Sequence, residues 1–105
     1  MLALELDGVR ISKISGNLDR LRLHSEKVNV LQGDASNASW WNGHPFDKIL
    51  LDAPCSASGI VARHPDIPFL RREADIKSLQ NMQRGILKQA WKMLKPDGLM
   101  LYVTC

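Results

Sequence analysis

Short apolar stretches alternate along the chain with longer stretches in which apolar residues recur every three or four positions. The first apolar stretch, Leu2 to Leu6, predicts a buried strand. The stretch after it predicts a helix, because its apolar positions share one helical face: Ile11, Ile14, Leu18 and Leu21. Val28 to Leu31 is short and rich in β-branched residues and stops at a Gly-Asp turn, so it predicts a second strand.

The second half of the chain continues this alternation. Phe46 to Leu51 predicts a third strand, and the breaker-rich run from Asp52 to Gly59 opens a long loop. From about Asp75 to Leu94 the apolar residues have helical spacing, which predicts a core-facing helix that ends at Lys95-Pro96-Asp97-Gly98. Leu99 to Val103 is continuously apolar, the pattern of a strand buried on both faces of a parallel sheet.

Strands that alternate with helices predict an α/β fold with right-handed crossovers and a doubly wound parallel sheet. Ligands of such sheets bind beyond the carboxyl ends of the strands. Reactive residue types follow the predicted strand ends in this sequence: Glu5, Asp34, Asp52, Cys55 and Cys105. Their positions predict an active site at one edge of the sheet.

Composition restricts the class of protein. The chain has 105 residues, of which 45% are hydrophobic and 24% are charged, as expected for one globular domain. No apolar stretch approaches the roughly 18 residues of a membrane span, and the start is not a signal peptide. Two cysteines form no disulfide framework, so we expect free thiols and a cytoplasmic protein.

Charge is distributed unevenly along the chain. The net charge is +3, but the segment from Arg63 to Lys95 carries eight basic and three acidic residues. A basic face on an otherwise acidic domain favours a polyanionic partner such as RNA. A solvated helix face explains the charge equally well. Arg63, His64, Arg71 and Arg72 are candidate phosphate contacts that would position a nucleic acid without reading its sequence.

Two acids suit the recognition of a nucleoside. Glu5, at the end of the first strand, is placed to accept hydrogen bonds from both ribose hydroxyls. Asp7 more plausibly caps the following helix. Asp34 is suited to an exocyclic amine such as that of adenine, although an Asp after a Gly is also an ordinary turn residue. Trp40 and the adjacent Trp41 offer stacking surfaces for bases, but such a pair more often covers the edge of a core.

The run Asp52-Ala53-Pro54-Cys55 places a carboxylate and a thiol three residues apart, and the proline stiffens the turn between them. An inert cysteine in a loop is the plain alternative. Cys105 adds a second thiol at another strand end, and strand adjacency would bring the two together. The three histidines have no ligand-like spacing with either cysteine, and a Cys-x-x-Cys pair is lacking, so we expect neither a metal site nor a redox pair.

Three segments together resemble the Sun/Fmu-type (RsmB-like) RNA (cytosine-5)-methyltransferases. They are the run Leu50 to Gly59, the run Arg63-His64-Pro65-Asp66-Ile67 with Leu70-Arg71-Arg72, and the ending Tyr102-Val103-Thr104-Cys105. The resemblance covers nearly the whole chain. It implies a Rossmann-like fold that uses S-adenosyl-L-methionine to methylate carbon 5 of a cytidine in 16S ribosomal RNA.

The resemblance also implies a role for each candidate residue. Cys105 matches the nucleophile that adds to the base, and Cys55 matches the second cysteine, which assists product release. Asp52 lies at the junction of cofactor and target base. Glu5 matches the acid that binds the cofactor ribose, where the family usually has Asp, and Asp34 matches the acid near the adenine.

The sequence also departs from the family pattern. It lacks the glycine-rich cofactor loop and the strand that precede Leu2 in the family, the N-terminal RNA-binding region, and the strands that follow Cys105. We therefore expect a partial catalytic domain over residues 1–105. The empty central slot, between the Leu2 and Phe46 strands, exposes sheet edges that favour self-association. We expect the 105 residues alone to bind S-adenosyl-L-methionine poorly and to methylate little, and micromolar binding by calorimetry would count against this.

Two further functions stay open at this point. The chain could act as a non-catalytic module that keeps the fold and binds RNA or a partner protein through its basic face. A DNA cytosine methyltransferase, which attacks from a Pro-Cys turn, is disfavoured by the Thr-Cys ending.

Overall fold

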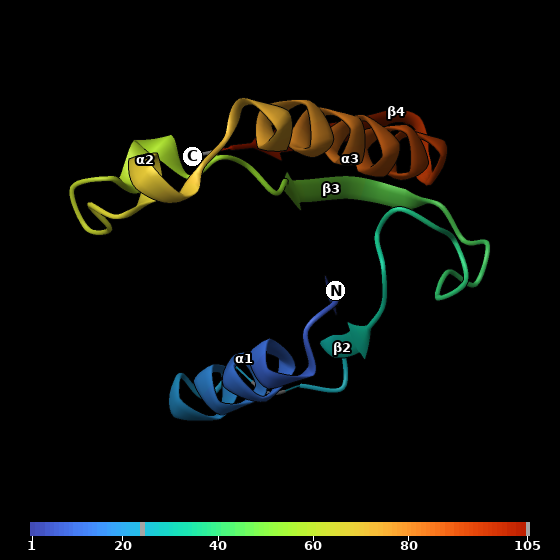
Figure 1. Ribbon diagram of the computed structural model, residues 1–105. Coiled ribbons are helices and arrows are strands. Elements are labelled where there is room, and N and C mark those ends of the chain that lie inside the picture. Colours follow the sequence, from blue (N-terminus) through green and yellow to red (C-terminus); the bar gives the residue numbers. More distant parts are fainter. Residues whose placement is uncertain (24, 105) are drawn as a thin grey trace. The chain divides into compact units, whose positions relative to one another are not determined.

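The computed structural model describes residues 1–23 and 25–104, and it divides into two compact units, Met1–Asn42 and Gly43–Cys105. Each unit contains one pair of parallel strands and a long helix (Figure 1). Every strand and both long helices expected from the sequence are present. The α/β class and the parallel pairing of strands are therefore confirmed.

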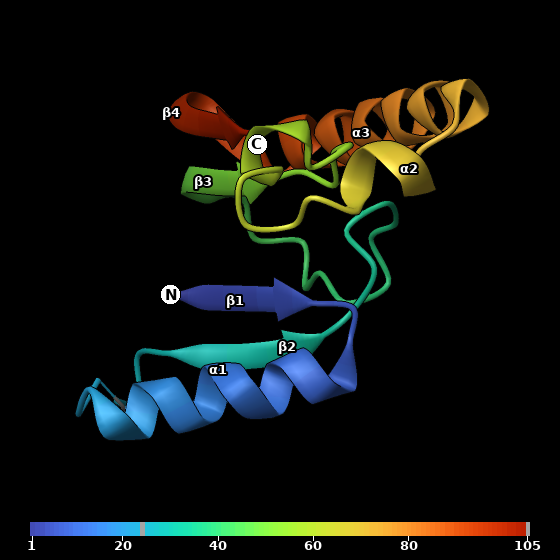
Figure 2. The same ribbon diagram turned by 60° about the vertical axis from the view of Figure 1, so that its left-hand side comes forward.

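In the first unit, β1 (Leu2–Glu5) pairs in parallel with β2 (Asn29–Gln32), and α1 (Gly8–Arg20) connects them. The helix packs on this strand pair and runs alongside β2 (Figure 2). Asp7 is the N-cap of α1, because its Oδ1 accepts a hydrogen bond from the backbone N–H of Val9 at 2.7 Å. The capping role expected for Asp7 is confirmed.

Gly33 makes the tight exit from β2. Its N–H donates to the Glu5 carbonyl at 3.0 Å, and a Cβ at this position would lie only 2.8 Å from Leu4 Cδ1 and 3.0 Å from Trp40 Cδ1. The Trp40 indole donates to the Asp34 carbonyl at 3.0 Å. The half-buried indole therefore packs over the strand ends, which is the covering role expected of a tryptophan here.

In the second unit, β3 (Phe46–Asp52) pairs in parallel with β4 (Leu94–Val103), and α3 (Glu73–Lys92) packs on this pair. The long connection from β3 to α3 contains a short 3-10 turn, η1 (Ser58–Ile60), and one helical turn, α2 (Ile67–Leu70). The sequence predicted only a loop here. The buried apolar residues of the described chain all belong to this unit: Leu51, Ala53, Ile86 and Met93.

The four residues Lys95 to Gly98 were expected to separate the helix from the last strand, but they lie inside β4. Phe46 pairs with Leu94 and Lys48 with Leu99, so these residues form a bulge on β4. Gly98 is needed there, because a Cβ would lie 2.8 Å from Leu94 Cδ1 and 2.9 Å from the Lys95 carbonyl oxygen.

The expectation that the last strand is buried on both faces is wrong for the described chain. Leu99 and Leu101 are 66% and 62% exposed, and Leu50 beside them on β3 is 70% exposed. The opposite face of the same strand pair carries Leu51, which is buried where α3 packs. An apolar run does not determine which elements cover it, and here α3 packs on one face of the strand pair. The strands form two two-stranded sheets, and a central strand between β1 and β3 stays a prediction.

Candidate active site

The two acids of the first unit lie at the carboxyl ends of adjacent parallel strands. Glu5 is the last residue of β1 and pairs with Gln32, the last residue of β2, and Asp34 follows two residues later. The Gly33 hydrogen bond to the Glu5 carbonyl ties the two strand ends together. The placement of both acids at one sheet edge, predicted from the sequence, is confirmed within this unit.

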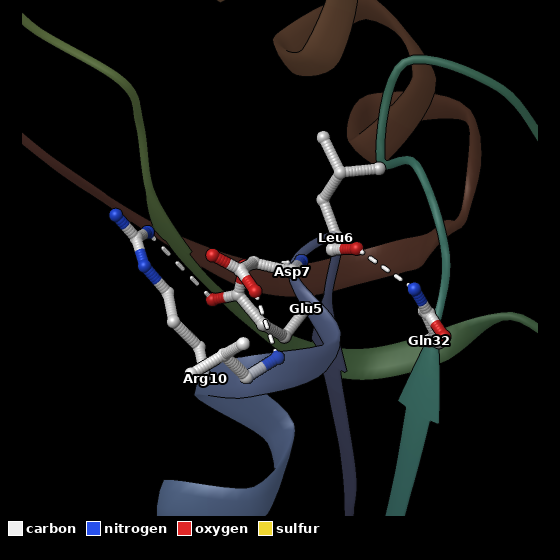
Figure 3. Close-up of polar contacts among 6 residues, drawn as sticks. Glu5, Leu6, Asp7, Arg10 and Gln32 are labelled. Carbon is white, nitrogen blue, oxygen red and sulfur yellow. Dashed lines mark hydrogen bonds and ion pairs between the residues drawn. The ribbon is translucent and has the colours of Figure 1, made fainter.

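The Glu5 carboxylate is held by the start of α1. Its Oε1 accepts a hydrogen bond from the Asp7 backbone N–H at 3.0 Å, and its Oε2 lies 4.0 Å from Nη1 of Arg10 (Figure 3). The side chain is only 22% exposed. Gln32 supports the same turn by donating from Nε2 to the Leu6 carbonyl at 3.1 Å. A carboxylate fixed in this way retains acceptor lone pairs for hydroxyl donors.

The Asp34 carboxylate belongs to a turn. Its Oδ1 accepts a hydrogen bond from the Ser36 backbone N–H at 2.8 Å. The backbone and hydroxyl hydrogen bonds from Ser36 lower the pKa of the Asp34 carboxyl below its usual value. The turn role that the sequence left open is therefore present, and it keeps the carboxylate in the ionised form that accepts hydrogen bonds.

The Asp52-Ala53-Pro54-Cys55 run leaves β3 as a turn that is anchored to β4. The Ala53 N–H donates to the Val103 carbonyl at 3.0 Å, which continues the β3–β4 ladder by one residue. The Ala53 side chain is buried, and Asp52 before it is exposed on the other side of the strand. The alternation of a strand thus buries the alanine and presents the carboxylate.

Cys55 follows this anchored turn and lines an open pocket of about 440 Å³. Cys55 is half-buried, and its sulfur accepts a hydrogen bond from the Ala57 N–H at 3.4 Å. Thr104, the residue after β4, lines the same pocket. The remaining lining residues come from the loop, α3 and β4: Ser56, Ile76, Leu79, Gln80, Gln83 and Tyr102. Cys55 and Thr104 therefore line one pocket, and Thr104 is the residue that precedes Cys105 in the sequence. Cys105 lies outside the described residues.

The four candidate RNA contacts are all exposed in the second unit. Arg63 and His64 follow η1, and their backbone N–H groups both donate to the Ile60 carbonyl. Arg72 precedes α3, where its own N–H donates to Asp75 Oδ2 at 2.8 Å. Arg71 differs from the others, because its Nε donates to the Ser56 carbonyl at 3.1 Å. It is therefore attached to the cysteine turn as well as exposed to solvent.

Reasoning from the sequence missed Gln83. This residue reaches from α3 to the turn, where its Nε2 donates to the Pro54 carbonyl at 2.6 Å. The contact joins residues that are 29 positions apart. The one signal in the sequence is a glutamine beside the apolar positions of a core-facing helix, between Leu79 and Ile86.

Within residues 1–23 and 25–104, no group of three or more His, Cys, Asp or Glu side chains is arranged to hold a metal ion. None of the helices formed by these residues is long and apolar enough to cross a membrane.

Parallel strand–helix units with polar residues at the strand ends are the organisation of an α/β domain of the ligand-binding class. A model of the family described as "16S rRNA methyltransferase RsmB/F" matches residues 1–105. The chain belongs to this family of ribosomal RNA methyltransferases. The family inferred from the sequence is confirmed.

Individual relatives agree with this assignment. The chain is 52% identical over its whole length to the ribosomal RNA small subunit methyltransferase B of Shewanella oneidensis, and 47% identical to the proteins of that name from Vibrio vulnificus and Vibrio cholerae. It spans 24% of the length of each. The crystal structure of PH0851 matches 99% of the chain with a TM-score of 0.91 and 33% identity, and the chain covers 23% of that structure.

Proposed function

We propose that the protein containing this chain uses S-adenosyl-L-methionine to methylate carbon 5 of a cytidine in 16S ribosomal RNA, through a covalent cysteine adduct. Membership of the family supports methylation of ribosomal RNA. The observation that carries the finer proposal is the pocket shared by Cys55 and Thr104, since Thr104 leads directly to the second thiol. The same proposal places the protein with its RNA in the cytoplasm.

Two thiols suit the methylation of cytosine. Carbon 5 is too weakly nucleophilic to take a methyl group unaided, so the Cys105 thiolate adds to carbon 6 and makes carbon 5 an enamine-like nucleophile. S-adenosyl-L-methionine supplies an electrophilic methyl group on its sulfonium. The proton on carbon 5 is then removed, and its electron pair restores the ring double bond as the bond from carbon 6 to sulfur breaks. Cys55 assists this release, and Asp52 hydrogen-bonds the ring edge as charge develops.

The residues of the first unit fit the cofactor. Glu5 is a partly buried carboxylate whose orientation is fixed by the Asp7 N–H, as needed to accept from two ribose hydroxyls. Asp34 is an acceptor held in its ionised form at the neighbouring strand end, suited to the adenine amine. Asp52 belongs to the second unit, where it is the last residue of β3, and it enters the proposal only through the family resemblance. Arg63, His64, Arg71 and Arg72 would contact RNA phosphates.

An RNA that contains 5-fluorocytidine tests the proposal, because fluorine at carbon 5 prevents the proton loss that releases the enzyme. The complete protein that carries this chain should form a covalent adduct that survives denaturing electrophoresis. The adduct should be lost on Cys105→Ser and kept on Cys55→Ser. The reverse result would make Cys55 the nucleophile and overturn the assignment of roles.

The absence of any adduct, together with RNA binding of unchanged affinity in both cysteine variants, would favour the non-catalytic alternative. The same experiment on the 105 residues alone tests a separate expectation. We propose that this chain by itself binds the cofactor poorly and forms little adduct, and that its sheet edges favour self-association.

A further inference from the structure

The two carbonyl groups that flank Cys55 are each held by a side chain from outside the turn. The Pro54 carbonyl accepts from Nε2 of Gln83 at 2.6 Å, and the Ser56 carbonyl accepts from Nε of Arg71 at 3.1 Å. Peptide planes on both sides of the thiol are thereby fixed. The direction of the Cα–Cβ bond of Cys55 depends on these two planes.

Gln83 is the more deeply placed of these two side chains. It is half-buried on the side of α3 that carries Leu79 and Ile86, and Ile86 is buried against the strand pair. A side-chain amide in such a place is unfavourable unless its polar atoms are bonded. Gln83 meets this requirement by donating to the turn, so the helix and the turn are held in one arrangement.

The turn contains a backbone conformation that contacts from outside the turn must stabilise. Ala57 has φ of 61° and ψ of 19°, the left-handed conformation that an alanine rarely adopts, and its N–H points at the Cys55 sulfur. Strained backbone of this kind persists only where the surroundings enforce it. The Gln83 and Arg71 hydrogen bonds are two of the contacts that hold the backbone on either side of Cys55.

We propose that Gln83 is a positioning residue for Cys55, which it holds toward the pocket for the release step. The inference rests on the proposed function, since it assumes that Cys55 assists the breaking of the bond from Cys105 to carbon 6. It adds a residue on α3 that acts through the Pro54 carbonyl. Arg71 supports the same turn from the other side.

Loss of the Gln83 donor should slow the breakdown of the covalent RNA complex. It should leave the attack of Cys105 on the base unchanged. Gln83→Met keeps the length and the helix propensity of the side chain but removes the donor. On RNA with ordinary cytidine, the covalent complex of this variant should persist about three- to ten-fold longer than that of the wild type, the effect of losing one hydrogen bond. The rate of adduct formation on 5-fluorocytidine RNA should change less than two-fold, about the noise of such a comparison.

Two further variants make the test specific. Gln89→Met places the same substitution at another half-buried position of α3 that does not line the pocket, and it should leave release unchanged. In a Cys55→Ser background, Gln83→Met should have no additional effect on release, because a residue that acts only through Cys55 has nothing left to position. Circular dichroism of each variant checks that it is folded.

The outcomes separate the two proposals. If the wild type forms no adduct on 5-fluorocytidine RNA, the proposed function fails and this inference fails with it. If the adduct forms and Cys55→Ser slows release, but Gln83→Met releases RNA at the wild-type rate, only the role of Gln83 is overturned. Slower release in Gln83→Met that adds fully to that of Cys55→Ser would also overturn it.

Discussion

The units Met1–Asn42 and Gly43–Cys105 are both strand–helix–strand arrangements, but different contacts stabilise them. Among the described residues, the second unit contains all the buried apolar side chains, whereas α1 in the first unit buries none completely. The first unit has half-buried apolar side chains and hydrogen bonds at its turns, including the Asp7 cap and the Gly33 contact to Glu5. Glu5 and Asp34 therefore belong to the less densely packed unit, and the Cys55 turn belongs to the unit with a core.

This difference has a consequence for function. Elements with few buried apolar contacts open locally at low free-energy cost. We expect Glu5 and Asp34 to be ordered only marginally in this chain by itself, whereas the turn that holds Cys55 keeps its shape. This difference is one physical reason for the proposal that the isolated chain binds the cofactor poorly.

The largest expected loss of stability comes from truncating an apolar side chain in each unit. The two losses test whether the second unit depends more on its buried core than the first unit does. Ile86→Ala should destabilise the second unit by about 2–5 kcal/mol, because it empties a buried site between α3 and the strands. Ile14→Ala removes a half-buried side chain from α1, and it should cost the first unit about 1 kcal/mol. Amide hydrogen exchange, resolved by segment, measures the two losses separately. Equal losses in both units after either substitution would show that they unfold together.

A smaller effect is expected from the cap of α1. Asp7→Ala removes the acceptor for the Val9 N–H and should destabilise the first unit by about 1 kcal/mol, seen as faster exchange in α1 and unchanged exchange in α3. Asp7→Asn retains a capping oxygen and is the matched control. An unaffected α1 in Asp7→Ala would contradict the importance of turn contacts in this unit.

The elements of both units could be predicted from the sequence because each is specified locally. Helical spacing marked α1 and α3, and the position of Asp7 before an apolar helix marked its cap. The placement of Asp52 at the end of β3 and of Cys55 just beyond it followed from the position of the breaker-rich run. Each of these features is determined by residues that are close together in the sequence.

Features that depend on residues far apart in the chain could not be predicted in this way. The Gln83 hydrogen bond to Pro54 and the Arg71 hydrogen bond to Ser56 exist only once α3 has packed on the strands. The exposure of Leu99 and Leu101 likewise depends on which elements are present to cover them. An apolar strand pattern does not indicate which elements pack on the strand.

The smallest expected effect concerns an exposed ion pair beside the β4 bulge. Nζ of Lys95 lies 2.6 Å from Oδ1 of Asp47, and this contact lowers the pKa of the Asp47 carboxyl below its ordinary value of 3.8. The unfolded carboxyl therefore binds protons at a higher pH than the folded one. The stabilisation is present above 3.8 and is lost as the pH falls through the lowered pKa.

Asp47→Asn tests this contribution in the unit that has a core. At neutral pH and low salt the variant should unfold slightly more easily than the wild type, by less than either substitution above, because the Asp47 side chain is 80% exposed. The difference should shrink as the pH falls below 3.8, where the wild-type carboxyl also becomes neutral, and at high salt. A difference that is constant with pH would mean that Asp47 acts through packing, and that charge has no part in holding the bulge.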